Sequence, residues 1–443
     1  MNFAYSIIRK LPSGKLVSHP NATSQAKHFI EESNLFTGSK DALKHFSKLT
    51  YLESDLLTIS SAVFAADRAS KRGEREDISR VIDLYIPVFC IDRLLPLISQ
   101  LKKILRDLSQ DHWNLMLGSL NKEVSDDLME DDLLEVLPKE GKALLFSGGL
   151  DSLGAAVEFG KNPLLLVSHL TKNTITRRSQ NELFELLLAK GYITRHHQYF
   201  VSSADIENID IEHAVESSQR TRSFVFLTLG VIAARREGFK ELILMAENGQ
   251  MAIHLPLTSG RIGAFSTHTA HPTVLSGTQS FFEIALNTSI TIRNPYVYKT
   301  KAEVVSIIIK ELPSAIPLST SCWKNTRVSQ SGTTHCGQCI PCYIRKISIE
   351  VAQTDPTTYA RDIWTENIEN LPDDDDGRRN LIDLLEFIYW FNTKKTDDLM
   401  CEFPELYSED FDAELAVAMY RRFAIESMQV FAKYPNISNL LKG

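Results

Sequence analysis

The chain has 443 residues, more than one average domain contains, so roughly two or three domains are expected. Hydrophobic residues make up 43% and charged residues 23%, and the net charge of −8 gives no general attraction to nucleic acid, so we expect no direct DNA binding. Because no apolar run could span a bilayer and the first residues lack a secretory pattern, we expect a cytoplasmic protein without membrane contact.

Residues 1–139 are expected to form an α+β region without a catalytic constellation. Its predicted elements are strands at 3–8 and 79–88 and an amphipathic helix at 93–108. A basic run at 65–72 is expected to be a solvated face, because isolated charge runs usually are. The acidic stretch at 126–132, followed by Pro138, indicates a boundary.

An apolar run at 143–146 leads directly into Ser-Gly-Gly-Leu-Asp-Ser at 147–152 and then into helix-forming residues. This order predicts a buried strand, a tight glycine turn and a helix whose N-terminus faces the turn. The exposed amides and the hydroxyls of Ser147 and Ser152 suit an anion with several oxygens, namely a pyrophosphate. A simple capped turn would not account for the paired serines.

Two common phosphate loops are excluded by the same residues. A Walker loop would end in Gly-Lys-Ser/Thr, and a dinucleotide loop would read Gly-x-Gly-x-x-Gly. A loop without the lysine suits retention of a pyrophosphate leaving group while an acceptor attacks the α-phosphorus. We expect Asp151 to help place a Mg²⁺ ion between the phosphates.

From 142 to 311, strand-like runs alternate with helical ones, which predicts an α/β fold with a parallel, doubly wound sheet. The further predicted strands lie at 164–168, 198–201, 241–246 and 289–292, and the predicted helices at 177–190 and 222–236. Ligands bind such sheets at the carboxyl ends of the strands. Several charged or amide residues share that position and become candidate ligands: Arg222, Glu247, Asn248, Arg261 and Lys301.

Four of the six cysteines follow the pattern Cys322-x13-Cys336-x2-Cys339-x2-Cys342. Four thiolates with two short spacings can close a tetrahedral site, so we predict a structural zinc knuckle with no open coordination position. An iron–sulfur cluster and unligated core cysteines are the alternatives. Residues 347–443 are predicted to be a helical tail, with its clearest helices at 378–392 and 411–433.

These motifs together resemble the 7-cyano-7-deazaguanine synthase (QueC) family of PP-loop ATP pyrophosphatases. The matching stretches are the loop at 147–152, Arg222-Ser223-x-x-Phe226-Leu227, Asn294-Pro295 leading to Lys301-Ala302-Glu303, and Ser321-Cys322 with the later cysteines and Arg345. The resemblance spans about 142–346 and implies a five-stranded HUP-type sheet in a domain at 140–346. A helical region at 347–443 would follow it.

The resemblance also implies a reaction and roles for residues. ATP would activate a 7-carboxy-7-deazaguanine-like carboxylate as an acyl-adenylate, and an amine would displace AMP to form an amide. The residues implied to bind ATP are Ser147, Gly148, Gly149, Leu150, Asp151, Ser152, Ser168 and His169, the last two beside the adenine. The implied catalytic residues are Asp151, Arg222 and Lys301. The expected substrate-binding residues are Arg222, from the resemblance, and Glu247, Asn248 and Arg261, from their position at the ligand edge of the sheet.

The chain is longer than the synthase, and the stretch 247–272 departs from the synthase's substrate loop. Ala66-Asp67-Arg68, Ile86-Pro87-Val88 and Leu108-x-x-Asp111-x-Trp113 resemble the N-terminal extension of QueC-like proteins in bacterial anti-phage systems, of the Qat and type IV CBASS kinds. Those relatives imply the N-terminal amine of a co-encoded protein partner as acceptor. A homodimer is also compatible with the sequence.

Three other classes stay open at this point. One is the plain synthase that uses ammonia, and another is a PP-loop tRNA-modifying enzyme, for which Cys90 and Cys401 are poorly placed as the reactive cysteine. The last is a module that only senses ATP. An amidotransferase synthetase is disfavoured because no glutaminase cysteine or domain is recognisable.

Overall fold

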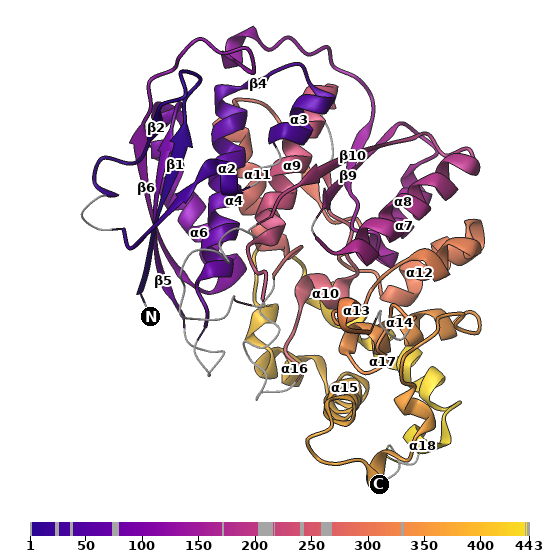
Figure 1. Cartoon of the computed structure of the whole chain (residues 1–443). Helices are drawn as coiled ribbons and strands as arrows, with labels where there is room; N and C mark the ends of the chain where they lie inside the picture. The colour runs from indigo at the N-terminus through magenta and orange to yellow at the C-terminus, as the bar shows by residue number, and fades with distance from the viewer. Residues whose placement is uncertain are drawn as a thin grey trace.

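The computed structural model describes residues 2–22, 26–35, 39–72, 79–170, 172–202, 216, 218–239, 243–257, 268–328, 332–438 and 440. Figure 1 shows an N-terminal sheet, a central sheet and a set of C-terminal helices. Within the described ranges, no helix combines the length and the apolar character needed to cross a bilayer. Arg261, a predicted substrate residue, lies outside the described residues.

The N-terminal region combines a mainly parallel sheet with helices. Its sheet strands are β1 (Asn2–Lys10), β2 (Leu16–Val17), β3 (His28–Glu31), β5 (Val81–Val88) and β6 (His112–Ser119). The sheet order is β2-β1-β5-β6 with β3 paired to β1, and only the β1–β2 pair is antiparallel. Strands β4 (Leu49–Thr50) and β7 (Leu128–Met129) form a separate pair.

The helices of this region are α2 (Glu32–Leu35), α3 (Ser39–His45), α4 (Tyr51–Ala69), α5 (Ile91–Leu94) and α6 (Ile98–Ser109). The two strands predicted here are confirmed as β1 and β5. The helix predicted at 93–108 is instead divided into α5, a 3₁₀ turn and α6. The turn holds Pro96, which lacks a backbone N–H and cannot donate to the preceding turn.

The central sheet is parallel throughout and has the order β10-β9-β8-β11-β12. Its strands are β8 (Lys142–Leu145), β9 (Leu164–Leu170), β10 (Thr194–Phe200), β11 (Ile243–Leu244) and β12 (Ile292–Arg293). Numbered by chain order this is 3-2-1-4-5: the chain runs outward from β8 through β9 and β10, and then crosses β8 to add β11 and β12 on the other side. The loops after β8 and β11 therefore flank one crevice, where doubly wound sheets bind ligands.

Helices cover both faces of the central sheet. They are α7 (Leu150–Phe159), α8 (Thr174–Ala189), α9 (Arg222–Glu237), α11 (Pro272–Leu286), α12 (Lys301–Glu311) and α14 (Ile340–Glu350), while the short helices α10 (Gly249–Ile253) and α13 (Asn325–Val328) lie in connecting segments. Along β8, Leu144 and the following Phe146 belong to the core with α7, α8 and α12. Ala143 and Leu145 belong to the core with α9 and α11. This alternation is the two-faced burial expected of a central parallel strand.

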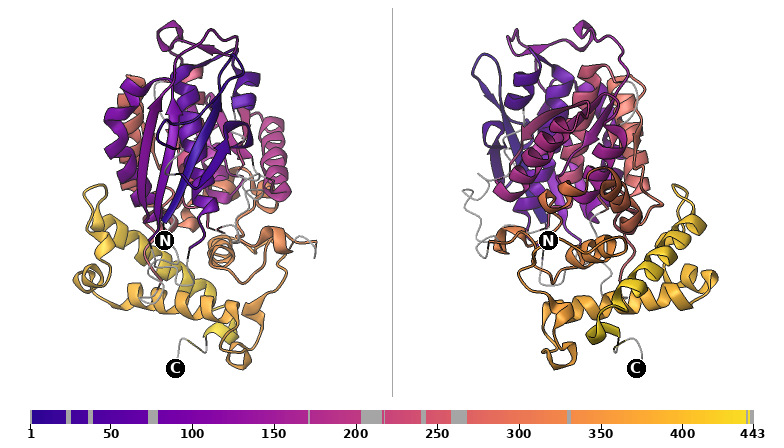
Figure 2. Two further views of the ribbon diagram at one scale, coloured as in Figure 1. Left: turned by 60° about the vertical axis from the view of Figure 1, so that its left-hand side comes forward. Right: turned by 90° about the vertical axis from the view of Figure 1, so that its right-hand side faces the viewer.

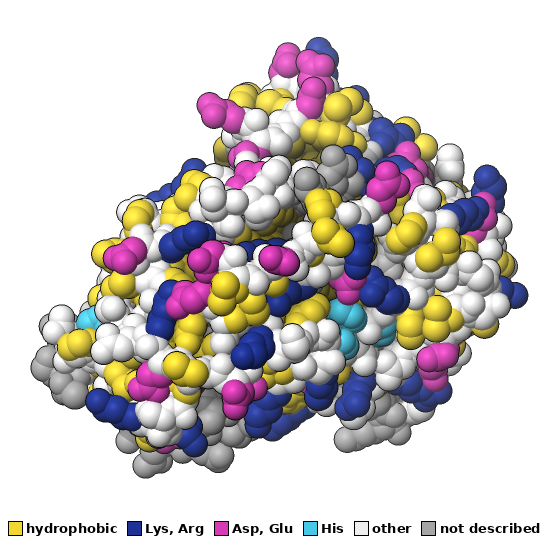
Figure 3. All heavy atoms as spheres, turned by 90° about the horizontal axis from the view of Figure 1, so that it is seen from above, with side chains coloured by type: hydrophobic (Ala, Val, Ile, Leu, Met, Phe, Trp, Pro, Cys, Tyr) yellow, Lys and Arg dark blue, Asp and Glu magenta, His cyan; other side chains and the backbone are white. Residues whose placement is uncertain are grey.

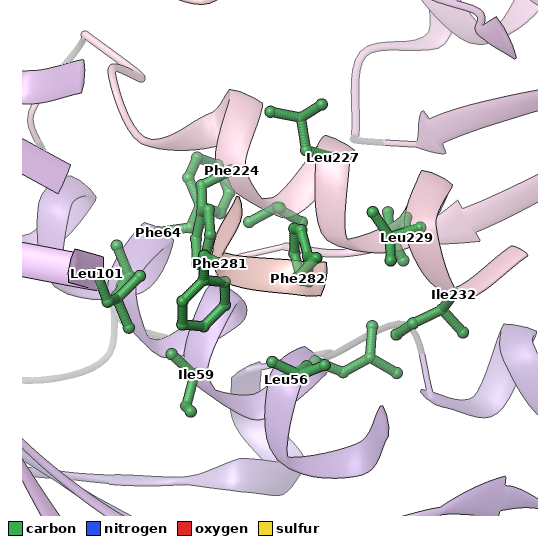
Figure 4. Packing of buried hydrophobic residues seen from close by; sticks show 14 of the residues in the cluster. Leu56, Ile59, Phe64, Leu101, Phe224, Leu227, Leu229, Ile232, Phe281 and Phe282 are labelled. Carbon is green, nitrogen blue, oxygen red and sulfur yellow. The ribbon is translucent and has the colours of Figure 1, made fainter. Parts of the chain in front are cut away.

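The N-terminal region packs on the α9–α11 face of the central sheet, and the two share one hydrophobic core. Figure 4 shows side chains of α4 and α6 in contact range of α9 and α11: Leu56, Ile59, Phe64, Leu101, Phe224, Leu227, Leu229, Ile232, Phe281 and Phe282. The rings of Phe224 and Phe282 stack with centroids 6.2 Å apart. The two regions therefore lie against each other as packed layers.

The basic run at 65–72 is not a solvated face, and this expectation is wrong. Asp67 is fully buried and Arg72 is 7% exposed. Arg80 donates to Asp67 and Asp111 at 2.5 Å each, and Arg72 donates to Asp111 at 2.6 Å. Burial is possible because each charge finds an opposite charge from another element. The Asp67 and Asp111 motifs therefore form a structural ion network.

The C-terminal helices are α15 (Asp376–Thr393), α16 (Thr396–Glu402), α17 (Ala413–Phe431) and α18 (Pro435–Ser438). The predicted helices at 378–392 and 411–433 are confirmed as α15 and α17. Both views of Figure 2 place this set, coloured orange to yellow, below the two sheets. Its core includes Ile253 of α10 and Ile344 of α14. Helix α14 also runs across the domain boundary expected at 346.

The face seen from above carries charges of both signs. Figure 3 shows Lys and Arg side chains interspersed with Asp and Glu, and no broad patch of one sign is visible among the described residues of this face. Mixed charge of this kind gives little electrostatic attraction to a polyanion. It agrees with the net charge of −8.

Candidate active site and metal centre

The loop between β8 and α7 is held by hydrogen bonds to its carbonyl oxygens. The carbonyl of Phe146 accepts the Ser168 hydroxyl at 2.6 Å. The carbonyl of Gly148 accepts the Ser179 hydroxyl and the Thr320 amide, both at 3.0 Å. Because its carbonyls are bound by the surrounding protein, the loop has a fixed position at the carboxyl end of β8, as predicted.

Gly148 adopts a φ of +83°, a backbone conformation that favours glycine. A Cβ there would also meet Gln180 and Ser179 at 3.2 Å. The Gln180 amide donates to the carbonyl of Ser147 at 3.3 Å. The hydroxyls of Ser147 and Ser152 lie 3.2 Å apart at the N-terminus of α7. The loop thus places two hydroxyls beside a positive helix end, which suits an anion.

Asp151 and Lys301 form a largely buried ion pair beside this loop. Their Oδ2 and Nζ atoms are 2.5 Å apart, and the side chains are 14% and 10% exposed. The Asn248 amide donates to the same Oδ2 at 3.2 Å. Lys301 is the first residue of α12, where the helix dipole disfavours a cation, so the Asp151 carboxylate supplies the compensating charge.

The second oxygen of Asp151 provides a test of the predicted magnesium role. Oδ1 is buried and has no hydrogen-bond partner among the described residues. A buried carboxylate oxygen without a donor is costly unless a cation or ligand satisfies it. Oxygen ligands of this kind are those that Mg²⁺ prefers, so the residues fit the ion.

Glu247 lies in the loop that follows β11, three residues after the strand ends, on the opposite side of the crevice. Asn294 fixes its backbone from both sides: the Asn294 Oδ1 accepts the Glu247 amide at 3.1 Å, and its Nδ2 donates to the Glu247 carbonyl at 2.6 Å. Burial and the nearby Asp151 carboxylate raise the pKa of Glu247 to about 7, against the opposing effect of Lys301. A carboxyl group of this kind can hold or release a proton near neutral pH.

These residues line one cavity of about 200 Å³. Its walls are formed by Ser147, Gly149, Leu150, Asp151, Ala246, Glu247, Met251, Lys301, Thr320, Ser321, Trp323, Pro341 and Ile344. The structure therefore brings together the predicted loop, Asp151, Lys301 and Glu247. Asn248 joins them through its bond to Asp151.

Ser168, His169 and Arg222 are not among the residues that line this cavity. The Ser168 hydroxyl is engaged by the loop carbonyl and by His196 Nε2 at 2.8 Å. Arg222 donates to His169 Nδ1 at 3.2 Å, so the His169 Nε2–H donates to the carbonyl of Val201 at 2.9 Å. Burial and the Arg222 charge lower the pKa of His169 to about 3. Arg222 is absent from the cavity lining that contains Lys301 within the described part of the chain.

The four predicted cysteine ligands converge. All four sulfur atoms lie within 4.8 Å of one another and all four residues are buried. The Cys322–Cys339 and Cys336–Cys342 sulfur pairs are each 3.9 Å apart. This arrangement fits a structural zinc ion with four thiolate ligands.

Backbone donors around the cysteines support the same assignment. The amides of Lys324 and Cys336 donate to the Cys322 sulfur at 3.2 and 3.4 Å, as expected for thiolates that carry negative charge. Gly337 has a φ of +71°, and a Cβ there would lie 1.8 Å from the carbonyl oxygen of Arg361. The knuckle also supplies Ser321 and Trp323 to the cavity wall, so it shapes the site from one side.

Sequence reasoning missed several residues that position the site. Ser179 and Gln180 lie on α8 without a motif, and Thr320 lies two residues before the first cysteine. Asn294 is named in the sequence only as part of the QueC-like stretch, without a predicted role, although it stands directly after β12 at the ligand edge of the sheet. Gln250 accepts the backbone amide of Lys301 at 3.1 Å.

A parallel doubly wound sheet with a glycine phosphate loop and a carboxylate at the switch point defines the central region as a nucleotide-binding α/β domain. Residues 142–353 match the family model described as "Queuosine biosynthesis protein QueC", a little under half of the chain. No curated protein matches the chain. The match supports a QueC-like, ATP-utilising domain of the PP-loop superfamily with 7-deazaguanine-related chemistry.

Proposed function

We propose that the protein uses ATP to adenylate a 7-carboxy-7-deazaguanine-like carboxylate and then transfers the acyl group to an amine, releasing AMP and pyrophosphate. The observation that carries this proposal is the cavity in which the phosphate loop, the Asp151–Lys301 pair and Glu247 meet. The match of residues 142–353 to the QueC family supports the deazapurine substrate. We also propose that the chain has three domains, at 1–139, 140–346 and 347–443.

The loop would act by holding the β- and γ-phosphates. Backbone amides at the start of α7 and the hydroxyls of Ser147 and Ser152 bind oxygens without adding a lysine charge, so pyrophosphate can leave with its charge stabilised. Asp151 would hold Mg²⁺, which when bound neutralises phosphate charge. Lys301 fixes the orientation of Asp151 through the 2.5 Å pair and adds a cation beside the α-phosphate.

The reaction has two balanced steps. A carboxylate oxygen attacks the α-phosphorus, the α–β phosphoanhydride bond breaks, and pyrophosphate leaves with the electron pair. The amine then attacks the acyl carbon, the acyl–oxygen bond breaks, AMP leaves and the nitrogen loses a proton. We assign Glu247 and Asn248 to the substrate, Arg222 to its carboxylate, Ser168 and His169 to the adenine side, and Arg261 to the substrate as well.

The proposed amine acceptor follows from the region at 1–139, which lies outside the QueC-like domain. The N-terminal motifs resemble those of QueC-like proteins of anti-phage systems, so we propose a defence role and the N-terminal amine of a co-encoded protein as acceptor. Ammonia is the competing acceptor, which would make the chain a plain 7-cyano-7-deazaguanine synthase. We also propose that the protein forms a homodimer and is located in the cytoplasm.

The test is incubation of the purified protein with ATP, Mg²⁺ and 7-carboxy-7-deazaguanine, with and without the co-encoded partner and ammonia. AMP and pyrophosphate are quantified, and the partner is analysed by intact-mass spectrometry. A mass gain on the partner together with AMP supports conjugation, whereas nitrile formation with ammonia assigns the plain synthase. Binding of ATP without AMP formation under all conditions contradicts the adenylation step.

A further inference from the structure

Helix α17 of the C-terminal region lies directly behind two elements of the cavity. Those elements are α10, which follows Asn248, and α12, which begins at Lys301. A Cβ added to Gly249 at the start of α10 would meet Met419 of α17 at 2.6 Å and the carbonyl of Val297 at 2.4 Å. The Val297 carbonyl leaves room only for glycine at this position, and the Met419 side chain brings α17 against the start of α10.

One chain of hydrogen bonds runs from α17 through α10 to Lys301. The Tyr420 hydroxyl donates to the carbonyl of Gln250 and accepts the amide of Leu255, both at 3.2 Å. Burial raises the pKa of Tyr420, so its hydroxyl keeps the proton it donates. The Gln250 side chain in turn accepts the backbone amide of Lys301 at 3.1 Å.

A second chain runs from α17 to the N-cap of α12. Thr300 caps α12: its hydroxyl accepts the amide of Glu303 at 3.1 Å and donates to Glu426 of α17 at 2.9 Å. Arg422 of α17 donates to the Glu303 carboxylate at 2.9 Å and to the carbonyl of Tyr298 at 2.7 Å. Helix α17 therefore holds Lys301 through two routes, one through Gln250 of α10 and one through Thr300, the N-cap of α12.

We propose that α17 is a positioning element for the reaction centre, with Tyr420 and Glu426 as positioning residues that hold Lys301 on Asp151. Neither residue lines the cavity that contains the ion pair. Helix α17 also lies beyond residues 142–353, so it adds to the QueC-like domain a support that this domain's matched part does not contain. The inference rests on the proposed role of Lys301 in adenylation.

The substitutions should matter because the Lys301–Asp151 pair must be positioned precisely for the reaction. Lys301 can stabilise charge at the α-phosphate only while its ammonium group and Asp151 are held in place, and a displacement of about 1 Å can lower a rate by roughly a hundredfold. A substitution in α17 should therefore lower kcat for pyrophosphate release and leave the KM for ATP nearly unchanged. The Tyr420 hydroxyl bonds to Gln250 and Leu255 and not to the phosphate loop, so its loss should leave ATP binding unaffected.

The experiment compares Tyr420→Phe and Glu426→Ala with Leu415→Ala and Ile425→Ala, two half-exposed residues of the same helix. We expect kcat to fall about tenfold or more for the first two and to stay within about twofold for the controls. Glu426→Gln keeps an acceptor for the Thr300 hydroxyl and should restore most of the rate. Zinc content and thermal midpoints show that each variant is folded.

A double-mutant cycle with Lys301→Met separates positioning from a general loss of stability. If α17 acts through Lys301, then Tyr420→Phe has no further effect on kcat in the Lys301→Met background. Additive effects, or equal losses in the control variants, overturn the inference. If the wild type binds ATP without forming AMP, a result that contradicts the proposed function instead, the same cycle is measured in unfolding free energy: coupling between Tyr420→Phe and Lys301→Met supports the link through Gln250, and additivity overturns it.

Discussion

Replacement of Glu247 by glutamine should change stability in a way that depends on pH. The folded protein raises the pKa of this carboxyl from 4.5 to about 7, chiefly through burial and then through the Asp151 charge. Between these values the unfolded chain loses the proton first, while the folded chain retains it. Folding is therefore penalised progressively as pH rises from about 4.5 to 7, and the penalty is complete above 7.

The rise of the pKa from 4.5 to about 7 corresponds to roughly 3 kcal/mol, since a tenfold change in the proton equilibrium is worth about 1.4 kcal/mol. The group is partly open to the cavity, and solvent screening lowers the value toward about 2 kcal/mol. Glu247→Gln cannot ionise and escapes this penalty. We therefore expect the variant to be more stable than the wild type by about 2 to 3 kcal/mol at pH 8 and equally stable near pH 4.5.

The assay is denaturant unfolding of both proteins at pH 5, 6, 7 and 8, with the difference in unfolding free energy plotted against pH. Glu140→Gln, an exposed carboxylate outside the cavity, is the control and should show no trend with pH. A Glu247→Gln difference that is the same at every pH, or that grows as pH falls, would refute the assignment of a raised pKa.

Three other changes have defined outcomes. Asp151→Ala should abolish pyrophosphate release without unfolding, as followed by product analysis and calorimetry, and retained turnover would contradict the loop assignment. Metal analysis should find about one zinc per chain, and Cys339→Ser should lose it and lower the thermal midpoint; iron, or no metal in the wild type, would contradict the knuckle. Asp111→Ala removes the carboxylate partner of Arg72 and leaves Arg80 with Asp67 alone, and it should cost about 3 to 5 kcal/mol in unfolding free energy; an unchanged denaturation midpoint would count against the ion network.

The central region was the most predictable part of the fold because its signals are local. The apolar run before Ser147 specified β8, the two glycines specified the turn, and Gly238, which ends α9 with a φ of +75°, specified the helix end. The cysteine spacing likewise predicted the cluster, since a four-thiolate site needs little beyond its ligands and tight turns.

The features that sequence reasoning missed depend on distant partners. Asp67 looks like a surface residue until Arg80 is placed beside it by strand β5, and the pairing of β1 with β3 and β5 leaves no local pattern. Helix α17 shows amphipathic spacing, but only the packing reveals that Tyr420 reaches α10. The hydrogen bond from Arg222 to His169 likewise joins two residues that are far apart in the sequence.

The measurement that tests the central claim most directly follows an oxygen atom. The protein is incubated with ATP, Mg²⁺, the co-encoded partner and a 7-carboxy-7-deazaguanine whose carboxylate carries a heavy oxygen isotope, and the AMP is analysed by mass spectrometry. Attack of the carboxylate on the α-phosphorus predicts that AMP leaves with one labelled oxygen. AMP that forms without the label, or ATP cleavage that does not require the carboxylate, would contradict adenylation of the substrate.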